Sequence, residues 1–330
     1  MEVVLLIIGL VLILLSFVDA LWTTFWVDNG AGPLAKRLAY WTWRGMKKLI
    51  GTELPSALSI VGPTVLLLSI LLWVTLLWAG WTMVFSSDPE ALVFTGKEGM
   101  PDLVGRIYFV GYSIFTMGNG DFSPTAGVWQ LATAVMTGSG MFMVTLAITY
   151  TISVVGAVVQ KRGFASQITG IGKTPEEFVI RGWNGHDLRS HDLPLNSIVG
   201  ELSMLTHQYR AYPILQYFHP SSSEDSPSVA VAVLDDALTI FSHGVPDAIR
   251  PNPVTLHSGR SAVSQFLRTM PGALIGPASE APRVPDLKRL RSAGVPTGNE
   301  SGFDAAVADR SEERRKVLGL VRNNGWQWPS

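Results

Sequence analysis

The chain has 330 residues, a length that allows two domains, and a formal net charge of −1 at pH 7. A charge this close to zero gives no indication of a nucleic-acid partner. The sequence contains no cysteine, which excludes disulfides and thiolate metal sites and suits a cytosolic soluble part. Apolar residues are unevenly spread: the first half is typical of a membrane protein and the second half of an ordinary soluble domain.

A long apolar run begins the chain, from Val3 to Val27. It is long enough to cross a bilayer, which takes about 20 residues. A secretory signal peptide is the alternative, but the run lacks a basic start and follows Glu2 instead, so we expect a retained membrane helix. Asp19 lies within this run, where a charge is costly unless it faces protein or water. We expect Asp19 near the membrane interface beside Trp22 and Trp26; a functional role is the alternative.

The connector from Asp28 to Pro55 is strongly basic, and the positive-inside rule therefore places it in the cytoplasm. Apolar and aromatic residues are interleaved with its cations. This pattern predicts an amphipathic helix lying on the inner leaflet, with a dedicated lipid sensor as the alternative. The cations are Lys36, Arg37, Arg44, Lys47 and Lys48, and the acids are Asp28 and Glu53.

A second apolar run, Ala57 to Phe85, is expected to return the chain to the outside. The next segment, Ser86 to Arg106, is then an external turret in which acids outnumber bases. This acidity either concentrates cations at a pore mouth or belongs to a merely solvated loop. The acids are Asp88, Glu90, Glu98 and Asp102, and the bases are Lys97 and Arg106.

A Gly-rich hexapeptide comes next, with apolar segments on both sides. A half-length helix, Gly105 to Phe115, leads directly into Thr116-Met117-Gly118-Asn119-Gly120-Asp121, and a third apolar run extends from Ala126 to Gln160. This layout is typical of a pore loop, because non-helical backbone at membrane depth is tolerated only where it is buried or lines water. The alternate glycines let successive carbonyls point the same way. Rings of such carbonyls replace the water shell of a bare cation.

The stretch from Tyr108 to Asp121 resembles the pore helix and filter of potassium channels. It is most similar to the two-transmembrane bacterial type and to the halves of two-pore-domain channels, whose filters read T-V-G-Y/F-G-D. Met117 stands where Val or Ile is usual, and Asn119 where Tyr or Phe is usual. The resemblance covers about a third of the chain, Ala57 to Gln160, and the matching filter residues are Thr116, Gly118, Gly120 and Asp121.

The resemblance implies how the hexapeptide would work. K⁺ would be held at Thr116, Met117, Gly118 and Asn119, by the Thr116 hydroxyl and these four carbonyls, with Gly120 completing the filter. Asp121 is expected to anchor the loop from behind, through a hydrogen bond to Tyr108. One chain supplies one pore loop, so a closed filter needs several copies around a symmetry axis. The resemblance implies a homotetramer, and no cofactor besides the permeant K⁺ ions.

Asn119 is the departure with the clearest predicted consequence. In the resembled family, the aromatic residue at this place packs behind the filter and holds the outer carbonyls apart. Asn is smaller, polar and more tolerant of left-handed backbone, so we expect weaker support. The prediction is K⁺ permeation with reduced preference over Na⁺, and a gain in preference for Asn119→Tyr.

Two features of the third run concern gating. Gly138 and Gly140 weaken a helix and permit a bend, and Gly140 best fits the place of the inner-helix hinge of the resembled family. Close helix packing through small residues is the alternative. Further on, Ile148, Ile152 and Val155 recur at three- and four-residue spacing and form one face. That face is either a hydrophobic constriction that closes by dewetting or a lipid-facing surface.

The charge pattern also predicts the topology. The third run ends at Lys161-Arg162, which marks a cytoplasmic end. Together with the basic connector, this places the N-terminus outside and the C-terminus in the cytoplasm. We therefore expect a multi-pass protein of the cell membrane.

The remaining sequence predicts a mainly helical cytoplasmic domain. Thr174-Pro175-Glu176-Glu177 is a typical helix start. Helical periodicity follows over Asn196 to Tyr209, Val229 to Phe241 and Val254 to Met270. The absence of a βαβ pattern argues against a nucleotide-binding domain. The expected domains are 1–56, 57–162, 163–270 and 271–330; the last comprises a Pro/Gly-rich linker, Pro271 to Glu300, and a charged helix, Ala305 to Val321.

His186-Asp187 and His191-Asp192 suggest a metal site only weakly. Their spacing of five does not place both histidines on one helical face, and the sequence offers no third ligand, so we expect no metal there. No nucleophile–base pair indicates catalysis, and an enzyme is the least expected reading.

The sequence therefore predicts an all-α membrane protein with three transmembrane helices, a re-entrant pore helix and filter, and a helical C-terminal domain. The expected function is a tetrameric potassium channel, embedded in lipid and gated at the inner helices or the filter by an unknown stimulus. The alternatives are a weakly selective monovalent cation channel and a non-conducting membrane-anchored sensor. An unknown ligand of the cytoplasmic domain is a further possible partner, and nucleic acid is not expected.

Overall fold

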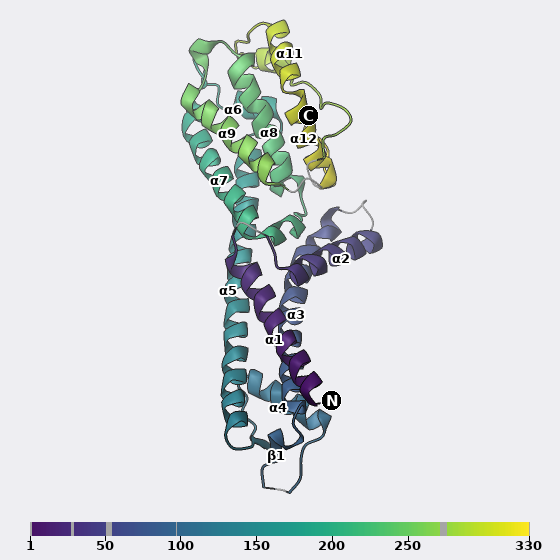
Figure 1. The fold of residues 1–330 in the computed structure, drawn as a ribbon. Helices are drawn as coiled ribbons and strands as arrows, with labels where there is room; N and C mark the ends of the chain where they lie inside the picture. The colour runs from purple at the N-terminus through teal and green to yellow at the C-terminus, as the bar shows by residue number, and fades with distance from the viewer. Residues whose placement is uncertain (1, 28–29, 51–54, 97, 271–275, 330) are drawn as a thin grey trace. The chain divides into compact units, whose positions relative to one another are not determined.

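A computed structural model describes residues 2–27, 30–50, 55–96, 98–270 and 276–329 (Figure 1). The chain divides into two compact units. The first unit is Met1–Thr42 with Pro63–Val154, and the second is Trp43–Gly62 with Val155–Ser330. Each unit is described by itself.

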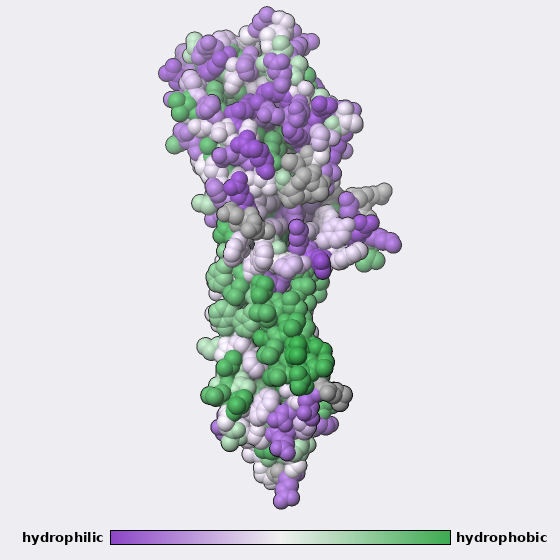
Figure 2. Space-filling view, viewed as in Figure 1, coloured by the Kyte–Doolittle hydropathy of each residue, from purple (hydrophilic) through white to green (hydrophobic). Residues whose placement is uncertain are grey.

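Within the described residues, three helices are long and apolar enough to cross a membrane, at Glu2–Phe25, Leu58–Ser86 and Val128–Ile171. They correspond to α1 (Glu2–Phe25), to a short 3₁₀ turn (Pro55–Ile60) with α3 (Val61–Ser86), and to α5 (Val128–Ile171). Figure 2 shows apolar side chains gathered along these helices in the first unit. The predicted all-α membrane fold with three spans is confirmed.

Helices α1 and α3 run antiparallel and in close contact (Figure 1). A Cβ on Gly9 would lie 2.7 Å from the Gly80 carbonyl oxygen, so only glycine fits there. Further along, Ser16 Oγ donates to the Trp73 carbonyl at 2.7 Å. Small residues at a helix interface let two backbones approach closely, which favours association where no hydrophobic effect operates.

Asp19 lies inside this packing and ties three helices together. Its carboxylate is 1% exposed. It accepts hydrogen bonds from the Trp73 indole at 2.8 Å, from Leu34 N at 2.7 Å and from Ala35 N at 3.1 Å. The last two amides belong to the first turn of α2 (Pro33–Ile50), where N–H groups have no acceptor within the helix. Asp19 supplies the acceptor for both, and its negative charge also suits this end of the helix dipole. Asp19 therefore faces protein, as a charge in a membrane helix requires, and its place near the membrane interface stays a prediction.

The turret contains structure that hydropathy did not predict. Strand β1 (Leu92–Phe94) pairs antiparallel with β2 (Phe122–Pro124), with Val93 opposite Ser123. Arg106, counted among the turret charges, is buried instead and donates to several backbone carbonyls. Its partners are the carbonyl oxygens of Phe85, Asp88 at 2.9 Å, Pro89 at 2.6 Å and Pro101 at 3.4 Å.

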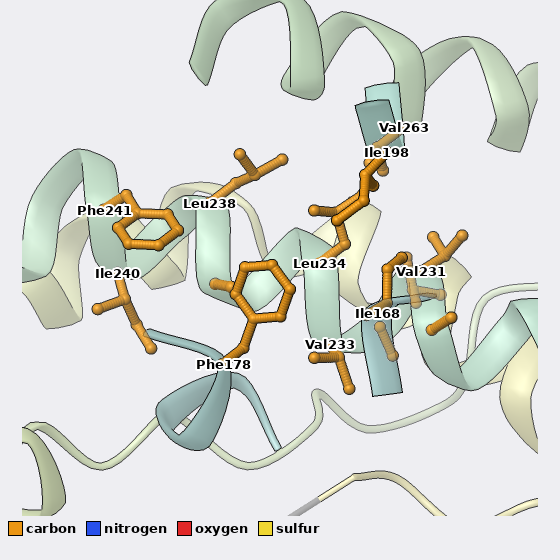
Figure 3. Close-up of a cluster of buried hydrophobic side chains, with 14 of the residues drawn as sticks. Ile168, Phe178, Ile198, Val231, Val233, Leu234, Leu238, Ile240, Phe241 and Val263 are labelled. Atoms are coloured by element: carbon orange, nitrogen blue, oxygen red, sulfur yellow. The ribbon is translucent and has the colours of Figure 1, made fainter. Parts of the chain in front are cut away.

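The second unit is helical and is built around α8 (Pro227–Thr239), every residue of which is buried. A single π-helical turn, Ile240–Gly244, continues it. Figure 3 shows Leu234, Leu238 and Phe241 among side chains from the surrounding helices. Those helices are α6 (Pro175–Arg181), α7 (Asp192–Ala211), α9 (Pro253–Thr269) and the C-terminal part of α5. The predicted helix start is confirmed, since Thr174 Oγ1 accepts from Glu177 N at 3.2 Å.

Two acids lie inside this otherwise apolar core, and each is paired. Asp236 accepts a bidentate bond from Arg314 at 2.8 and 2.9 Å, with both side chains 1% exposed. Asp235 pairs with Arg260 and Arg310. A buried charge without a partner is strongly destabilising, so the central helix depends on arginines from later elements.

The C-terminal segment belongs to this core, so the predicted linker and tail are corrected. Helix α10 (Leu287–Ser292) lies within the predicted linker, and its Leu290 is fully buried. The predicted single charged helix is two, α11 (Glu300–Asp309) and α12 (Ser311–Asn323). Arg314 is on α12, so this helix is held against the core both by its ion pair with Asp236 of α8 and by apolar packing.

Candidate functional site

A short helix positions the hexapeptide. Helix α4 (Leu103–Ile114) begins where Asp102 Oδ1 accepts from Gly105 N at 2.8 Å, which caps its first turn. Its twelve residues make a helix of about 18 Å, too short to cross a bilayer. At its C-terminal end the Thr116 and Met117 amides donate to the carbonyls of Ser113 at 3.1 Å and Tyr112 at 2.8 Å. The chain then turns out of the helix.

Glycines let α4 approach both neighbouring helices. A Cβ on Gly111 would lie 2.6 Å from the Trp78 ring on α3, whose indole N–H donates to the Ile107 carbonyl at 2.9 Å. On the other side, a Cβ on Gly140 of α5 would lie 2.4 Å from the Ile114 carbonyl oxygen. Any larger residue at Gly140 would push the end of α4 away. The start of the hexapeptide is thus fixed against α5.

The backbone of the hexapeptide alternates in handedness. Thr116, Gly118 and Gly120 have φ values of 57°, 62° and 77°, and within the described chain Thr116 is the only non-glycine residue with positive φ. When every second residue is left-handed, successive carbonyls turn to the same side of the strand. Glycine adopts this conformation at little cost, whereas a β-branched residue such as threonine is strained there, a feature that clusters at functional sites.

Tyr108 on α4 supports the loop from behind. Its hydroxyl donates to Asp121 Oδ2 at 3.1 Å, so the hydrogen bond expected between these two residues is present. The same hydroxyl accepts a hydrogen bond from the Asn119 amide, which sequence reasoning missed. The ring of Tyr108 packs against Tyr112 at 5.2 Å between centroids, and the Tyr112 hydroxyl donates to the Phe122 carbonyl at 3.2 Å. The polar Asn119 therefore has a support of its own.

The outer end of the loop is held by the turret. Thr95 N donates to the Asp121 carbonyl at 3.0 Å, next to the β1–β2 pair. Asp88 Oδ2 accepts from the Trp129 indole at 2.9 Å and so joins the turret to the first turn of α5. Both ends of the hexapeptide are fixed, while its residues are exposed in the single chain; Met117, for example, is 64% exposed.

Helix α5 carries the residues considered for gating. It is helical without interruption from Val128 to Ile171, so neither Gly138 nor Gly140 breaks it. A Cβ on Gly138 would meet nothing within 4 Å, whereas Gly140 makes the close contact with α4 described above. The close-packing alternative is therefore realised at Gly140, and its role as a hinge stays a prediction.

The three residues of the predicted constriction lie on one exposed side of α5. Ile148, Ile152 and Val155 are 57%, 68% and 48% exposed. The opposite side is buried and includes Met143, Ala147, Tyr150 and Val154. Exposed apolar side chains on a membrane-length helix suit lipid, a pore or a neighbouring subunit equally.

The two histidine pairs lie in different surroundings. In the part of the chain that the structure describes, no three His, Asp or Glu side chains come together as a metal would require. His191 is a core residue: it is buried, stacks on Phe178 at 5.2 Å, and has Nε2 3.2 Å from the Val179 carbonyl. Burial lowers the pKa of its imidazole. His186 is exposed on the surface.

Comparison with known proteins identifies the same segment. Residues 71–157 match a family described as "Ion channel". An uncharacterized membrane protein of Bacillus subtilis (strain 168), YdjJ, is 40% identical over 321 residues, which cover 97% of this chain and 94% of that protein. No solved structure matches.

Proposed function

Because the chain belongs to the potassium channel pore-loop family, and is a membrane protein of which YdjJ is a full-length relative, we propose that it conducts K⁺ through a carbonyl-lined filter as a homotetramer. The observation that carries this proposal is the alternating left-handed backbone at Thr116, Gly118 and Gly120. In this proposal the ligands are the Thr116 hydroxyl and the carbonyls of Thr116, Met117, Gly118 and Asn119. Rings of carbonyls substitute for the hydration shell of the ion.

The proposed assembly follows from the exposure of the loop. The hexapeptide of one chain is one wall of a filter, and rotational symmetry around an axis would close it. In that arrangement the C-terminal ends of the α4 helices point their partial negative charge at a cation below the filter. Tyr108 and Asp121 hold the loop from behind and do not contact the ion.

The inner half of the conduction path is assigned to α5. In this proposal Ile148, Ile152 and Val155 face the axis and close the pore by dewetting. The hinge of α5 is assigned to Gly138 and Gly140, next to the C-terminal end of α4. The protein is proposed to lie in the plasma membrane with its N-terminus outside and its C-terminus in the cytoplasm, since the basic connector and Lys161-Arg162 favour the inner side. Its partners would be lipid and monovalent cations.

A second function, a weakly selective monovalent cation channel, is favoured by one observation. Asn119 replaces an aromatic residue, and its support consists of a hydrogen bond to Tyr108 instead of ring packing. A single polar contact restrains the outer carbonyls less than a packed ring, so Na⁺ would be rejected less strongly. Flux measured in K⁺ and in Na⁺ separates the two functions.

Flux into liposomes tests conduction itself, with a closely matched pair of variants. Gly120 and Gly96 both have φ of 77°, and a Cβ on either would meet nothing within 4 Å. Alanine therefore strains both positions equally, but only Gly120 lies in the proposed filter. We expect K⁺ uptake by the unmodified protein and by Gly96→Ala, and loss of uptake in Gly120→Ala. Equal uptake in both variants, or no uptake by the unmodified protein, would contradict the proposal.

A further inference from the structure

The second unit contains a small cavity that conduction does not use. Its volume is about 20 Å³, enough for one water molecule or a monatomic ion. Polar side chains of Lys161, Tyr209, Gln216, Ser226, Ser228 and Asn324 line it. They come from α5, α7, the turn after α7, the start of α8 and the end of α12.

Lys161 is a buried lysine without a carboxylate partner. Its side chain is 5% exposed, and Nζ donates to the carbonyls of Leu215 and Phe218, both at 2.9 Å. Nζ also lies 5.4 Å from the centre of the Tyr209 ring. Within the described residues it forms no ion pair, although buried charges in proteins are normally paired. In its protonated form the side chain has three donors, and the third is left without an acceptor beside the cavity.

The N-terminus of α8 opens onto the same cavity. The side chain of the N-cap residue, Ser226, accepts no hydrogen bond from a backbone amide of the first turn, and Pro227 supplies no N–H. The amides of Ser228 and Val229 have no partner within the helix, because the first turn of a helix lacks acceptors. The helix dipole adds partial positive charge at this end.

Two buried hydroxyls add a further donor. Ser226 and Ser228 are 1% and 4% exposed, and their Oγ atoms lie 2.9 Å apart. One hydroxyl donates to the other, which leaves the second proton free to donate elsewhere. Both residues line the cavity, so this proton, the Lys161 ammonium and the helix N-terminus act on one small space.

A buried histidine lies next to the cavity lining, beside Pro220. His219 is 2% exposed, has Nδ1 3.2 Å from the Pro220 carbonyl, and stacks on Trp326 at 5.7 Å. Burial, and to a lesser extent the nearby charge of Lys161, lower the pKa of His219. No acidic residue is among those that line the cavity.

We propose that this cavity binds a small inorganic anion, with chloride as the physiological occupant. The anion would supply the counter-charge that Lys161 lacks and accept hydrogen bonds from its third N–H, from the serine pair and from the first turn of α8. The small volume suits a halide better than the larger phosphate or a nucleotide. This site is distinct from the proposed filter, and its occupancy would stabilise the second unit whether or not the protein conducts.

Thermal unfolding of the full chain in detergent tests the site without any flux measurement. Chloride replaces gluconate at constant K⁺ concentration and ionic strength. We expect a saturable rise in the unfolding midpoint, because a ligand that binds only the folded state stabilises it. Bromide should act like chloride, and phosphate should not. Ser228→Ala should raise the chloride concentration at half-effect about ten-fold, equivalent to about 1.4 kcal/mol.

Lys161→Met is the decisive variant, and Lys173→Met is its control, since Lys173 is an exposed lysine of the same unit. We expect the chloride effect to vanish in Lys161→Met and to persist in Lys173→Met. Should Lys161→Met not fold, anomalous diffraction from crystals of the unmodified protein in bromide locates the anion directly. The same midpoint in chloride and gluconate, a saturable effect that survives Lys161→Met, or bromide absent from the cavity would each overturn the proposal.

Discussion

The Tyr108 hydroxyl donates a hydrogen bond to Asp121 Oδ2 at 3.1 Å. A phenol hydroxyl is both donor and acceptor, and here the acceptor side takes the Asn119 amide N–H. One side chain of α4 thus holds two positions of the loop, Asn119 and Asp121. In the proposed filter, this pair of bonds replaces the packing that an aromatic residue at position 119 would provide.

Tyr108→Phe tests that role. Phenylalanine keeps the ring that packs on Tyr112 and removes only the hydroxyl. Two hydrogen bonds at about 0.5–1.5 kcal/mol each are lost. We expect the permeability ratio of K⁺ to Na⁺ to fall by up to about ten-fold, since about 1.4 kcal/mol corresponds to that factor. Tyr112→Phe is the control, because its hydroxyl contacts Phe122 beyond the hexapeptide. A ratio unaltered in Tyr108→Phe would assign the support of Asn119 elsewhere.

Polar substitution at the predicted constriction tests the gate. An amide at position 148 or 152 retains water where a sec-butyl group excludes it. Ile148→Asn and Ile152→Asn are therefore expected to raise the open probability in single-channel recordings. Val135→Asn is the control, since Val135 is similarly exposed, at 62%, on a different side of α5. If both isoleucine variants open as rarely as the unmodified protein, the gate lies elsewhere, most directly at the filter.

Single cysteines test the topology, since the chain has none of its own. A cysteine at Glu90, in the turret, should react with an impermeant reagent applied to intact cells. A cysteine at Lys47, on the exposed basic side of α2, should react only after the cells are opened. Labelling of a cysteine at position 47 in intact cells would contradict the proposed orientation.

Asp19→Asn tests the contact between α1, α2 and α3. The amide presents an NH₂ group to donors from Trp73, Leu34 or Ala35, so at least one hydrogen bond becomes a donor–donor contact. A buried donor left without a partner costs about 1–3 kcal/mol. We expect a lower unfolding midpoint in detergent, and no change for Glu2→Gln, which removes an exposed charge from the same helix. Equal midpoints would show that the three-helix contact does not depend on the charge of Asp19.

The buried His191 predicts acid destabilisation. Burial lowers its folded-state pKa below the ordinary value of 6.5, so the unfolded chain binds the proton first as the pH falls. The stability associated with the neutral ring is complete above about pH 6.5 and decreases below it. His191→Asn should make the midpoint of unfolding less sensitive to pH between 7 and 5, whereas His186→Asn, at an exposed position, should not. His219 has the same sign of shift and accounts for a remaining slope.

The membrane helices and the loop could be predicted because their signals are local. Apolar length gives the spans, and the spacing of Gly118 and Gly120 after a short apolar helix gives the loop. The turret strands could not be predicted, because three residues are too few to show alternation and β1 pairs with β2 from the far side of α4.

Polar contacts between residues far apart in the sequence could not be predicted either. Asp19 meets Trp73 fifty-four positions away, and Arg314 meets Asp236 seventy-eight positions away. Neither pairing has a periodic signature, since tertiary packing alone brings the partners together. The bond from Asn119 to Tyr108 is of the same kind. From the sequence alone, Asp19 indicated only a charge in a membrane helix, Arg314 a charged tail, and Asn119 a weakened filter.

The reversal potential under bi-ionic conditions tests the central claim most directly. The purified full chain is placed in a planar bilayer with K⁺ on one side and Na⁺ on the other. If the filter conducts K⁺ and is supported through Asn119 and Tyr108, the reversal potential has the sign expected when K⁺ is more permeant than Na⁺. In Tyr108→Phe the reversal potential then shifts toward zero. A reversal potential at zero in the unmodified protein would contradict K⁺ selectivity, and the absence of any current would contradict the channel itself.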